Sequence, residues 1–254
     1  MSSAHETYFQ LLDRQKFMVE DVDYSVLERH KVGLQQLAEI SNSTISVFDS
    51  YKRAHVFYSS NFGNMLGYSL KELDEGGEYF LDTKVHPDDF TALWQNAITF
   101  LKVYFNLPDA EKRDYKLVSE YRILNSADNY VRVIEQQMVL ELDINGNLWL
   151  GLSILDISPN QKNMNEGIKS EVLNFKTGRI FPLVKTEEDT ANALTKREIE
   201  ILKLVKNGFL SKEISGKLNI SVNTVNTHRQ RVLEKLDVDN SMEAVMLASK
   251  LGLV

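Results

Sequence analysis

The chain has 254 residues, a formal net charge of −7 and no cysteine. With 43% apolar residues it can fill one large or two modest cores, which argues against disorder throughout. The lack of cysteine excludes structural disulfides, thiolate zinc sites and cysteine nucleophiles. The polar N-terminus does not have the apolar stretch of a signal peptide, and no run of about 18 uncharged apolar residues occurs. We therefore expect a cytoplasmic protein that does not enter a membrane.

The first 60 residues predict two helices followed by a hairpin. Residues 5–17 and 25–40 have helical periodicity. The second helix carries a stripe that could dock on a domain or pair with its twin in a dimer, formed by Val26, His30, Leu34 and Leu37. The runs 44–50 and 54–60 are rich in β-forming residues and are joined by a polar break, which is typical of a hairpin.

The next segment predicts short helices and one long helix. Ser69 and Glu72 have the spacing of a capping box, in which a hydroxyl and a carboxylate satisfy free N–H groups at the helix start. Residues 86–105 open with Pro87 and two acidic residues and then repeat apolar residues at helical spacing. This pattern indicates one long helix with a buried face.

Three longer strands are predicted at 115–124, 130–142 and 148–158. The turns between them are rich in residues that accept left-handed backbone angles. Two strands, short helices, one long helix and three strands predict a five-stranded antiparallel sheet with helices on one face. The first part of the chain is therefore expected to have an α+β fold.

This order of elements, with the stretches "NMLGYSLKEL" and "HPDD", resembles a PAS sensor domain over residues 38–158. The resemblance implies a small pocket in a family whose members bind haem, flavin, small metabolites or nothing. The lack of cysteine excludes a cysteinyl-flavin adduct. Only His55 and His86 occur in this segment, and the position of His86 at a helix start favours a capping or surface role, so the sequence argues against haem. The cofactor and the ligand-binding residues stay open.

Residues 159–192 are expected to connect two domains. The stretch "PNQKNMNEG" has the composition of a linker, whereas 170–184 predicts two short strands around a Thr177-Gly178 turn, a hairpin that could extend the sensor. We expect a helical segment at 1–37 before the PAS-like domain at 38–158, and a separate domain at 193–254 after the connector.

The last 60 residues differ in charge and in pattern from the rest. Residues 195–254 hold 10 Lys and Arg against 7 Asp and Glu, although the whole chain is acidic. Thr195 and Glu198 form a second capping box, and Gly208 suits the left-handed position past a helix end. Ser211 and Ser221 are candidate caps of the next two helices. These cap and turn residues predict an all-α domain of four helices with a tight turn before the third.

The third of these helices has two distinct faces. Its buried face is predicted to hold Val225, His228, Val232, Leu233 and Leu236, with His228 as a core or cap residue rather than a ligand. Its outward face then carries amide, hydroxyl and guanidinium groups, namely Asn223, Asn226, Thr227, Gln230 and Arg231. Such a helix, held to a short partner helix, has the chemistry that reads base edges in the major groove.

The stretches "LTKREIEILKLVKNG", "SKEIS", "LNIS", "TVNTH" and "EKLDV" resemble the DNA-binding domain of LuxR-type transcription regulators over residues 193–254. The resemblance implies that the third helix enters the major groove and that the fourth forms a dimer contact. The expected base-reading residues are Asn223, Asn226, Thr227 and Gln230. The expected phosphate contacts are Lys196, Lys212, Thr224, Arg229 and Arg231. The expected dimer contacts are Met242, Val245, Met246 and Ser249.

The sequence therefore predicts a one-component transcription regulator, whose partners would be double-stranded DNA, a second copy of the chain, a small ligand and RNA polymerase. An enzyme is not expected, because no phosphate-binding glycine loop, H-E-x-x-H or G-x-S-x-G motif occurs. An acyl-homoserine-lactone sensor, a phosphorylation-controlled response regulator and a protein that retains the helix-turn-helix without binding DNA are the alternatives. The strand grouping at 115–158 contradicts the alternating strands and helices of a phosphorylation receiver.

Overall fold

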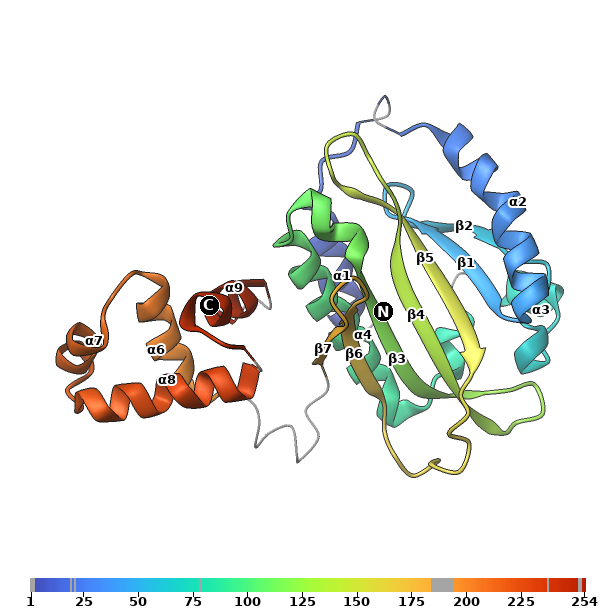
Figure 1. The fold of residues 1–254 in the computed structure, drawn as a ribbon. Helices are drawn as coiled ribbons and strands as arrows, with labels where there is room; N and C mark the ends of the chain where they lie inside the picture. The colour runs from blue at the N-terminus through green and yellow to red at the C-terminus, as the bar shows by residue number, and fades with distance from the viewer. Residues whose placement is uncertain are drawn as a thin grey trace. The chain divides into compact units, whose positions relative to one another are not determined.

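A computed structural model describes residues 3–18, 20, 22–77, 79–183, 194–236, 238–250 and 253–254. The chain divides into two compact units, an N-terminal unit with a β-sheet and a C-terminal helical unit (Figure 1). The predicted boundary between the connector and the last domain, at 192 and 193, lies outside the described residues. Each unit is described below by itself.

The described part of the N-terminal unit contains one antiparallel sheet with seven strands in the order β2-β1-β5-β4-β3-β6-β7. The five predicted strands are confirmed as β1 (Thr44–Asp49), β2 (Ala54–Tyr58), β3 (Tyr115–Leu124), β4 (Tyr130–Leu142) and β5 (Leu148–Ile157). The expected strand number of five is wrong for the sheet as a whole. The predicted hairpin forms β6 (Lys169–Asn174) and β7 (Arg179–Pro182), and β6 pairs with β3, whose edge would otherwise leave backbone groups unpaired.

One face of the sheet is covered by α2 (Tyr24–Ser41), which begins at the cap residue Asp23. The contact is a hydrophobic cluster in which Leu27, Leu34 and Ala38 of the helix pack with strand residues that include Ile45 and Val47. Of the stripe predicted on this helix, Leu34 is buried but Leu37 remains 45% exposed. The buried face is therefore rotated from the prediction.

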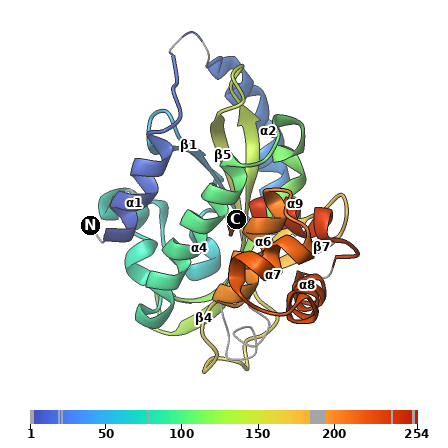
Figure 2. The ribbon, with the colours of Figure 1, turned by 90° about the vertical axis from the view of Figure 1, so that its left-hand side faces the viewer.

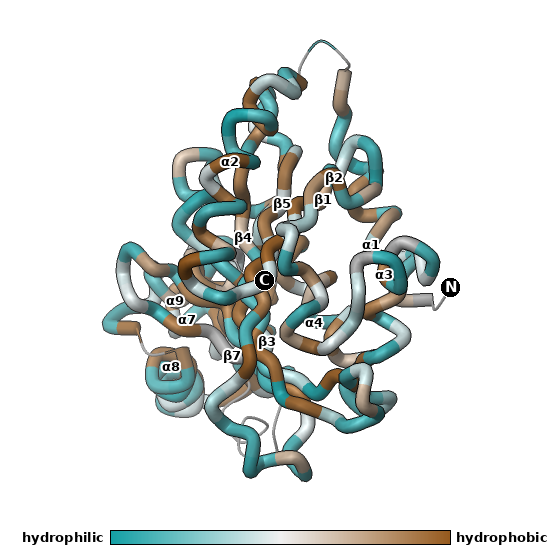
Figure 3. Tube along the Cα trace, turned by 90° about the vertical axis from the view of Figure 1, so that its right-hand side faces the viewer, coloured by the Kyte–Doolittle hydropathy of each residue, from teal (hydrophilic) through white to brown (hydrophobic). Residues whose placement is uncertain are grey.

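The opposite face, called here the inner face, is covered by α1, α3 and α4 (Figure 3). These helices are α1 (Ser3–Leu12), α3 (Leu70–Gly76) and α4 (Pro87–Phe105), with short 3-10 turns at η2 (Asn64–Leu66), η3 (Asp82–Lys84) and η4 (Asp109–Asp114). The capping box is confirmed, because the Glu72 backbone N–H donates to the Ser69 hydroxyl and the Ser69 N–H donates to the Glu72 carboxylate. The predicted first helix ends earlier than expected, at Leu12.

The segment after β5, whose composition is typical of a linker, is fixed to the sheet. Arg132 of β4 is fully buried and donates to the carbonyl oxygens of Asn163 (3.0 Å) and Glu166 (2.7 Å) and to the Glu120 carboxylate (3.2 Å). Arg122 donates to the Met164 carbonyl at 3.1 Å. A buried guanidinium needs acceptors for its five N–H donors, and the backbone carbonyls of the sheet are already used in strand pairing. The loop after β5 supplies the remaining acceptors.

The described C-terminal unit is helical, with α6 (Lys196–Lys206), α7 (Ser211–Leu218), α8 (Val222–Leu236) and α9 (Ser241–Lys250). Ile201, Ile214 and Val225 form the core between α6, α7 and α8. A second cluster joins α6, α8 and α9 through Leu202, Val232, Ala244 and Ala248. Among the described residues of either unit, no helix has both the length and the apolar character needed to span a membrane.

Candidate nucleic-acid interface

The third helix of the C-terminal unit, α8, has the two faces expected from the sequence. Val225 and Val232 are buried and fix the rotation of the helix against α6, α7 and α9. The polar residues on the other side are all exposed, namely Asn223, Thr224, Asn226, Thr227, Gln230 and Arg231. Their side chains are therefore free to meet a partner while the apolar side holds the helix in position.

A tight turn joins α7 to α8. Asn219 ends α7 in the left-handed conformation, with φ 51°, and the Ile220 N–H donates to the Ser215 carbonyl. The Thr224 N–H donates to the Ser221 hydroxyl at 3.0 Å, which confirms Ser221 as the cap of α8. The geometry is that of a helix-turn-helix, with α8 as the second helix of the motif.

Some of the outward side chains are already oriented by local contacts. The Thr227 hydroxyl donates to the Asn223 carbonyl at 3.0 Å, and the Gln230 amide donates to the Glu234 carboxylate at 3.3 Å. The Thr224 hydroxyl lies 2.8 Å from that of Ser221. These bonds are short-range and lie at the surface, so they can exchange for bonds to a ligand at small cost.

The cations proposed from the sequence fall into two environments. Lys196, Lys212 and Arg231 are exposed. Arg229 is partly buried, and its two terminal nitrogens donate to the hydroxyls of Ser211 and Ser241, each at 2.8 Å. The charge of Arg229 therefore faces its own domain, which differs from the open position expected of a phosphate contact.

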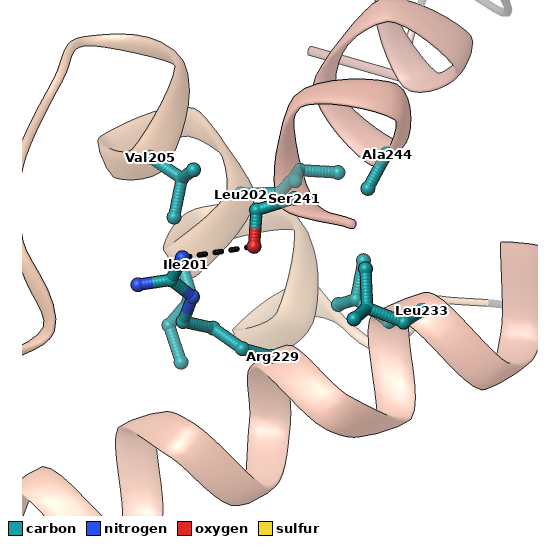
Figure 4. A pocket seen from close by; sticks show the side chains of 8 residues that line it. Ile201, Leu202, Val205, Arg229, Leu233, Ser241 and Ala244 are labelled. Atoms are coloured by element: carbon teal, nitrogen blue, oxygen red, sulfur yellow. Dashed lines mark hydrogen bonds between the residues drawn. The ribbon is translucent and has the colours of Figure 1, made fainter. Parts of the chain in front are cut away.

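Ser211 does not cap α7 as predicted, because its hydroxyl accepts from Arg229, and Leu210 precedes the helix. The Leu210 N–H instead donates to the Glu213 carboxylate at 2.8 Å. Figure 4 shows the Arg229 side chain beside a pocket lined largely by apolar residues of α6, α8 and α9. The Arg229–Ser241 bond crosses this pocket and ties α8 to α9.

A buried carboxylate links the start of α6 to the end of α8. Glu198 is 1% exposed, accepts from the Thr195 N–H at 2.7 Å, and accepts from the Lys235 ammonium at 2.9 Å. Burial alone would raise the pKa of Glu198, but the Thr195 N–H and Lys235 outweigh burial and lower it. The capping box was predicted, whereas Lys235 was missed, because a residue 37 positions away gives no local signal.

The residues expected at a dimer contact lie on one side of α9. Met242 is 71% exposed and Met246 is 55% exposed, whereas Val245 and Ser249 are partly buried. Val245 also packs against the cluster of α6, α8 and α9. Two exposed methionines one helical turn apart form an apolar surface that the C-terminal unit does not cover itself.

The two histidines of the predicted PAS-like segment lie in different environments. His86 fits the predicted capping role, because its Nδ1 accepts from the Asp88 N–H at 3.2 Å. Burial lowers the pKa of His55 to about 4, so this imidazole is neutral near neutral pH. Within the described ranges, no group of three or more His, Cys, Asp or Glu side chains is arranged to hold a metal ion.

Comparison with known proteins finds a family match in the C-terminal unit. Residues 192–248 match the family described as "Bacterial regulatory proteins, luxR family". The chain is 39% identical over 69 residues to "Uncharacterized response regulatory protein YgeK" of Escherichia coli (strain K12), which covers 27% of this chain and 47% of that protein. It is 37% identical over 99 residues to "Transcriptional regulatory protein DesR" of Bacillus subtilis (strain 168), which covers 39% and 49%. The chain thus spans about half the length of these curated relatives.

A solved structure of the VqmA dimer of Vibrio cholerae is 15% identical to this chain, covers 83% of both chains and has a TM-score of 0.32. The family match covers the capping box of α6, the turn between α7 and α8, and the polar face of α8. Residues 192–248 are therefore a LuxR-type helix-turn-helix domain of the bacterial regulatory proteins.

Proposed function

We propose that the chain is a one-component transcription regulator that binds double-stranded DNA through α8. The observation that carries this proposal is the exposed polar face of α8 in a domain that matches the luxR family. Asn and Gln pair with adenine through two hydrogen bonds, and Thr contacts several bases. Asn223, Asn226, Thr227 and Gln230 are therefore assigned to base reading.

Phosphate contacts are assigned to Lys196, Lys212, Thr224 and Arg231, whose side chains are exposed. Arg229 is assigned instead to holding α8, since both of its terminal nitrogens are used within the domain. This division matches a general property of protein–DNA interfaces, in which phosphate contacts position the protein and base contacts specify the sequence.

The regulator is proposed to act as a homodimer with two contact surfaces. One is the face of α9 with Met242 and Met246. The other is the solvent side of α2, where Val32 is 65%, Leu37 45% and Ile40 86% exposed. A two-fold dimer would present two copies of α8 to the two halves of a pseudo-palindrome. A single helix contacts too few base pairs to select one site in a genome.

The N-terminal unit is proposed to be a PAS-like sensor of a small molecule. Support comes from the central strand order β2-β1-β5-β4-β3 and from the helices that lie between β2 and β3 in the chain. Control by phosphorylation is less well supported, because the strand pairings of this unit are antiparallel, whereas a receiver needs parallel strands alternating with helices.

The proposal is tested by fluorescence anisotropy of the full chain with a labelled pool of random duplexes at low and at moderate salt. We expect binding at low salt that weakens steeply as salt rises, and enrichment of a two-fold symmetric sequence after repeated selection. Lack of binding at low salt by a folded chain would contradict the proposal. Binding without any enriched sequence would contradict the base-reading roles alone.

A further inference from the structure

The N-terminal helix α1 lies beside α4 on the inner face of the sheet (Figures 2 and 3). Its side chains make the contact. His5 is 6% exposed and meets Trp94 of α4 edge to face, with ring centroids 3.9 Å apart. Phe9 lies with its ring centroid 6.5 Å from that of Phe48 on β1. Side-chain packing therefore holds α1 against α4 and the sheet.

The inner face of the sheet also carries polar groups. Glu135 of β4 accepts hydrogen bonds from Ser153 (2.6 Å), Gln137 (3.0 Å) and Tyr121 (3.1 Å), which are all neutral donors. Tyr8 of α1 also meets Trp94 edge to face, with ring centroids 5.5 Å apart, and burial followed by the Glu135 charge raises the pKa of its phenol to about 12. Two aromatic side chains of α1 that carry hydrogen-bonding groups, His5 and Tyr8, thus pack against Trp94 of α4.

His5 reaches a second acidic group. Its Nε2 lies 3.5 Å from the Asp82 carboxylate, and its ring centroid lies 5.2 Å from that of Tyr79. Tyr8 and His5 of α1 each combine an aromatic ring with a hydrogen-bonding group. A small aromatic molecule with a hydrogen-bond donor has the same two features.

The segment that follows α1 is tied to the other end of the sheet. The Leu148 N–H donates to the Gln15 side-chain oxygen at 2.6 Å, and the Asn147 amide donates to the Lys16 carbonyl at 3.3 Å. Asp13 forms an ion pair with Arg53. These bonds are made by residues 13–16, which follow the last residue of α1, so they attach the chain to the sheet independently of the helix.

We propose that α1 is a lid that occupies the ligand site of the PAS-like domain, and that a small aromatic ligand with a hydrogen-bond donor takes the place of Tyr8 and His5 when α1 swings away. This inference rests on the proposed sensor function of the N-terminal unit. A closed lid lowers apparent ligand affinity by the fraction of molecules in which the lid is open. The sensor would then report ligand through release of α1.

The test uses 4-methylphenol, an analogue of the Tyr8 side chain, as the probe. The chain has two tryptophans, so Trp149→Phe leaves Trp94, which contacts α1, as the fluorescent reporter. We expect a chain that starts at Asp13 to bind the probe saturably, and the full chain to bind it about tenfold or more weakly, since the lid competes. Tyr8→Ala in the full chain should also bind the probe, whereas Glu6→Ala, an exposed change on the same helix, should behave as the parent.

Equal probe affinity in the parent, the shortened chain and Tyr8→Ala would overturn the lid. If the shortened chain does not fold, Tyr8→Ala against Glu6→Ala makes the same comparison. Hydrogen exchange of the unaltered full chain gives a separate readout: the lid requires α1 to exchange while β4 and β5 stay protected, and exchange of all three together would overturn it. DNA binding is measured on the same variants, so that failure of the lid is distinguished from failure of the proposed regulator.

Discussion

Arg229 on α8 donates a hydrogen bond of 2.8 Å to the hydroxyl of Ser241 on α9, and its other terminal nitrogen donates to Ser211 on α7. One side chain therefore connects the proposed base-reading helix to both neighbouring helices. The guanidinium sits beside the small pocket between α6, α8 and α9 (Figure 4). This bond network makes Arg229 a positioning residue, whose loss would let α8 shift.

Arg229→Ala should weaken DNA binding without changing its dependence on salt. A phosphate contact that is lost lowers the salt slope by about 1, because one fewer counterion is released. Arg231→Ala, which removes an exposed cation of the same helix, should show that change and serves as the matched control. Anisotropy titrations at four salt concentrations measure both slopes. If Arg229→Ala reduced the salt slope as much as Arg231→Ala does, Arg229 would be a phosphate contact after all.

The base-reading assignment predicts position-specific losses. Asn226→Ala or Gln230→Ala should cost about 1–3 kcal/mol at one base pair and relax the preference there, because a bidentate contact is lost. Binding to duplexes with every single substitution in the selected site measures this. Lys212→Ala should weaken all sequences alike. Identical sequence profiles for the amide variants and Lys212→Ala would rule out the division of roles.

The buried Glu198 should stabilise the C-terminal unit. Glu198→Gln leaves Lys235 and the Thr195 N–H with a weaker acceptor, so the unit should lose about 1–3 kcal/mol of unfolding free energy. Hydrogen exchange of α6 and α8 in the full chain measures the loss. Glu200→Gln, which removes a half-exposed partner of Arg197, should change it by less than about 0.5 kcal/mol. Equal effects of the two changes would contradict a structural role for Glu198.

The strands and the helix caps could be predicted because their signals are local. Alternation of apolar residues marked β3 to β5, and Thr195 with Glu198 marked the start of α6. The features that the sequence did not predict depend on contacts between residues that are far apart in the sequence. The pairing of β6 with β3 and the hold of Arg132 on the loop at 163–167 arise only when the sheet has formed. The contact of His5 with Trp94 and that of Arg229 with Ser211 likewise leave no periodic pattern in the sequence.

The acidic side chain beneath α1 predicts a pH effect on the N-terminal unit. Burial and the nearby Glu135 charge raise the pKa of Asp82 to about 7 from its usual 3.8. The folded state therefore holds a proton that the unfolded chain releases, so stability should fall as pH rises from about 4 to about 7 and change no further from this group above that. His5, whose pKa is lowered by burial and by the charge of the N-terminus, acts in the opposite sense below its usual 6.5.

Asp82→Asn should remove the part of the pH dependence that belongs to the carboxyl group. Urea unfolding followed by Trp94 fluorescence at pH 5, 6, 7 and 8, in the Trp149→Phe background, gives the difference between variant and parent at each pH. That difference should grow in favour of the variant from pH 5 to pH 7 and then level off. A difference that is constant with pH would show that the Asp82 carboxyl does not titrate in this range.

The two apolar surfaces on α2 and α9 predict a dimer held at two places. Ile40→Glu puts a charge on the 86% exposed position of α2, and Met242→Glu does the same at the 71% exposed position of α9. Each change alone should weaken the dimer, and the two together should give a monomer, because a carboxylate cannot be buried in an apolar contact without a partner. Light scattering of the full chain across a concentration series measures the oligomeric state. Leu210→Glu, at a 69% exposed position outside both surfaces, is the control and should remain dimeric.

The same variants connect assembly to DNA recognition. A dimer gains affinity when both copies of α8 bind, since the second contact is made within one complex at high effective concentration. The parent and Leu210→Glu should therefore bind a palindrome much more tightly than a half-site, and the double variant should bind both alike. A monomeric parent that binds a half-site as tightly as a palindrome would contradict the proposed dimer. It would also leave the N-terminal unit without a means of changing DNA affinity through the spacing of two recognition helices.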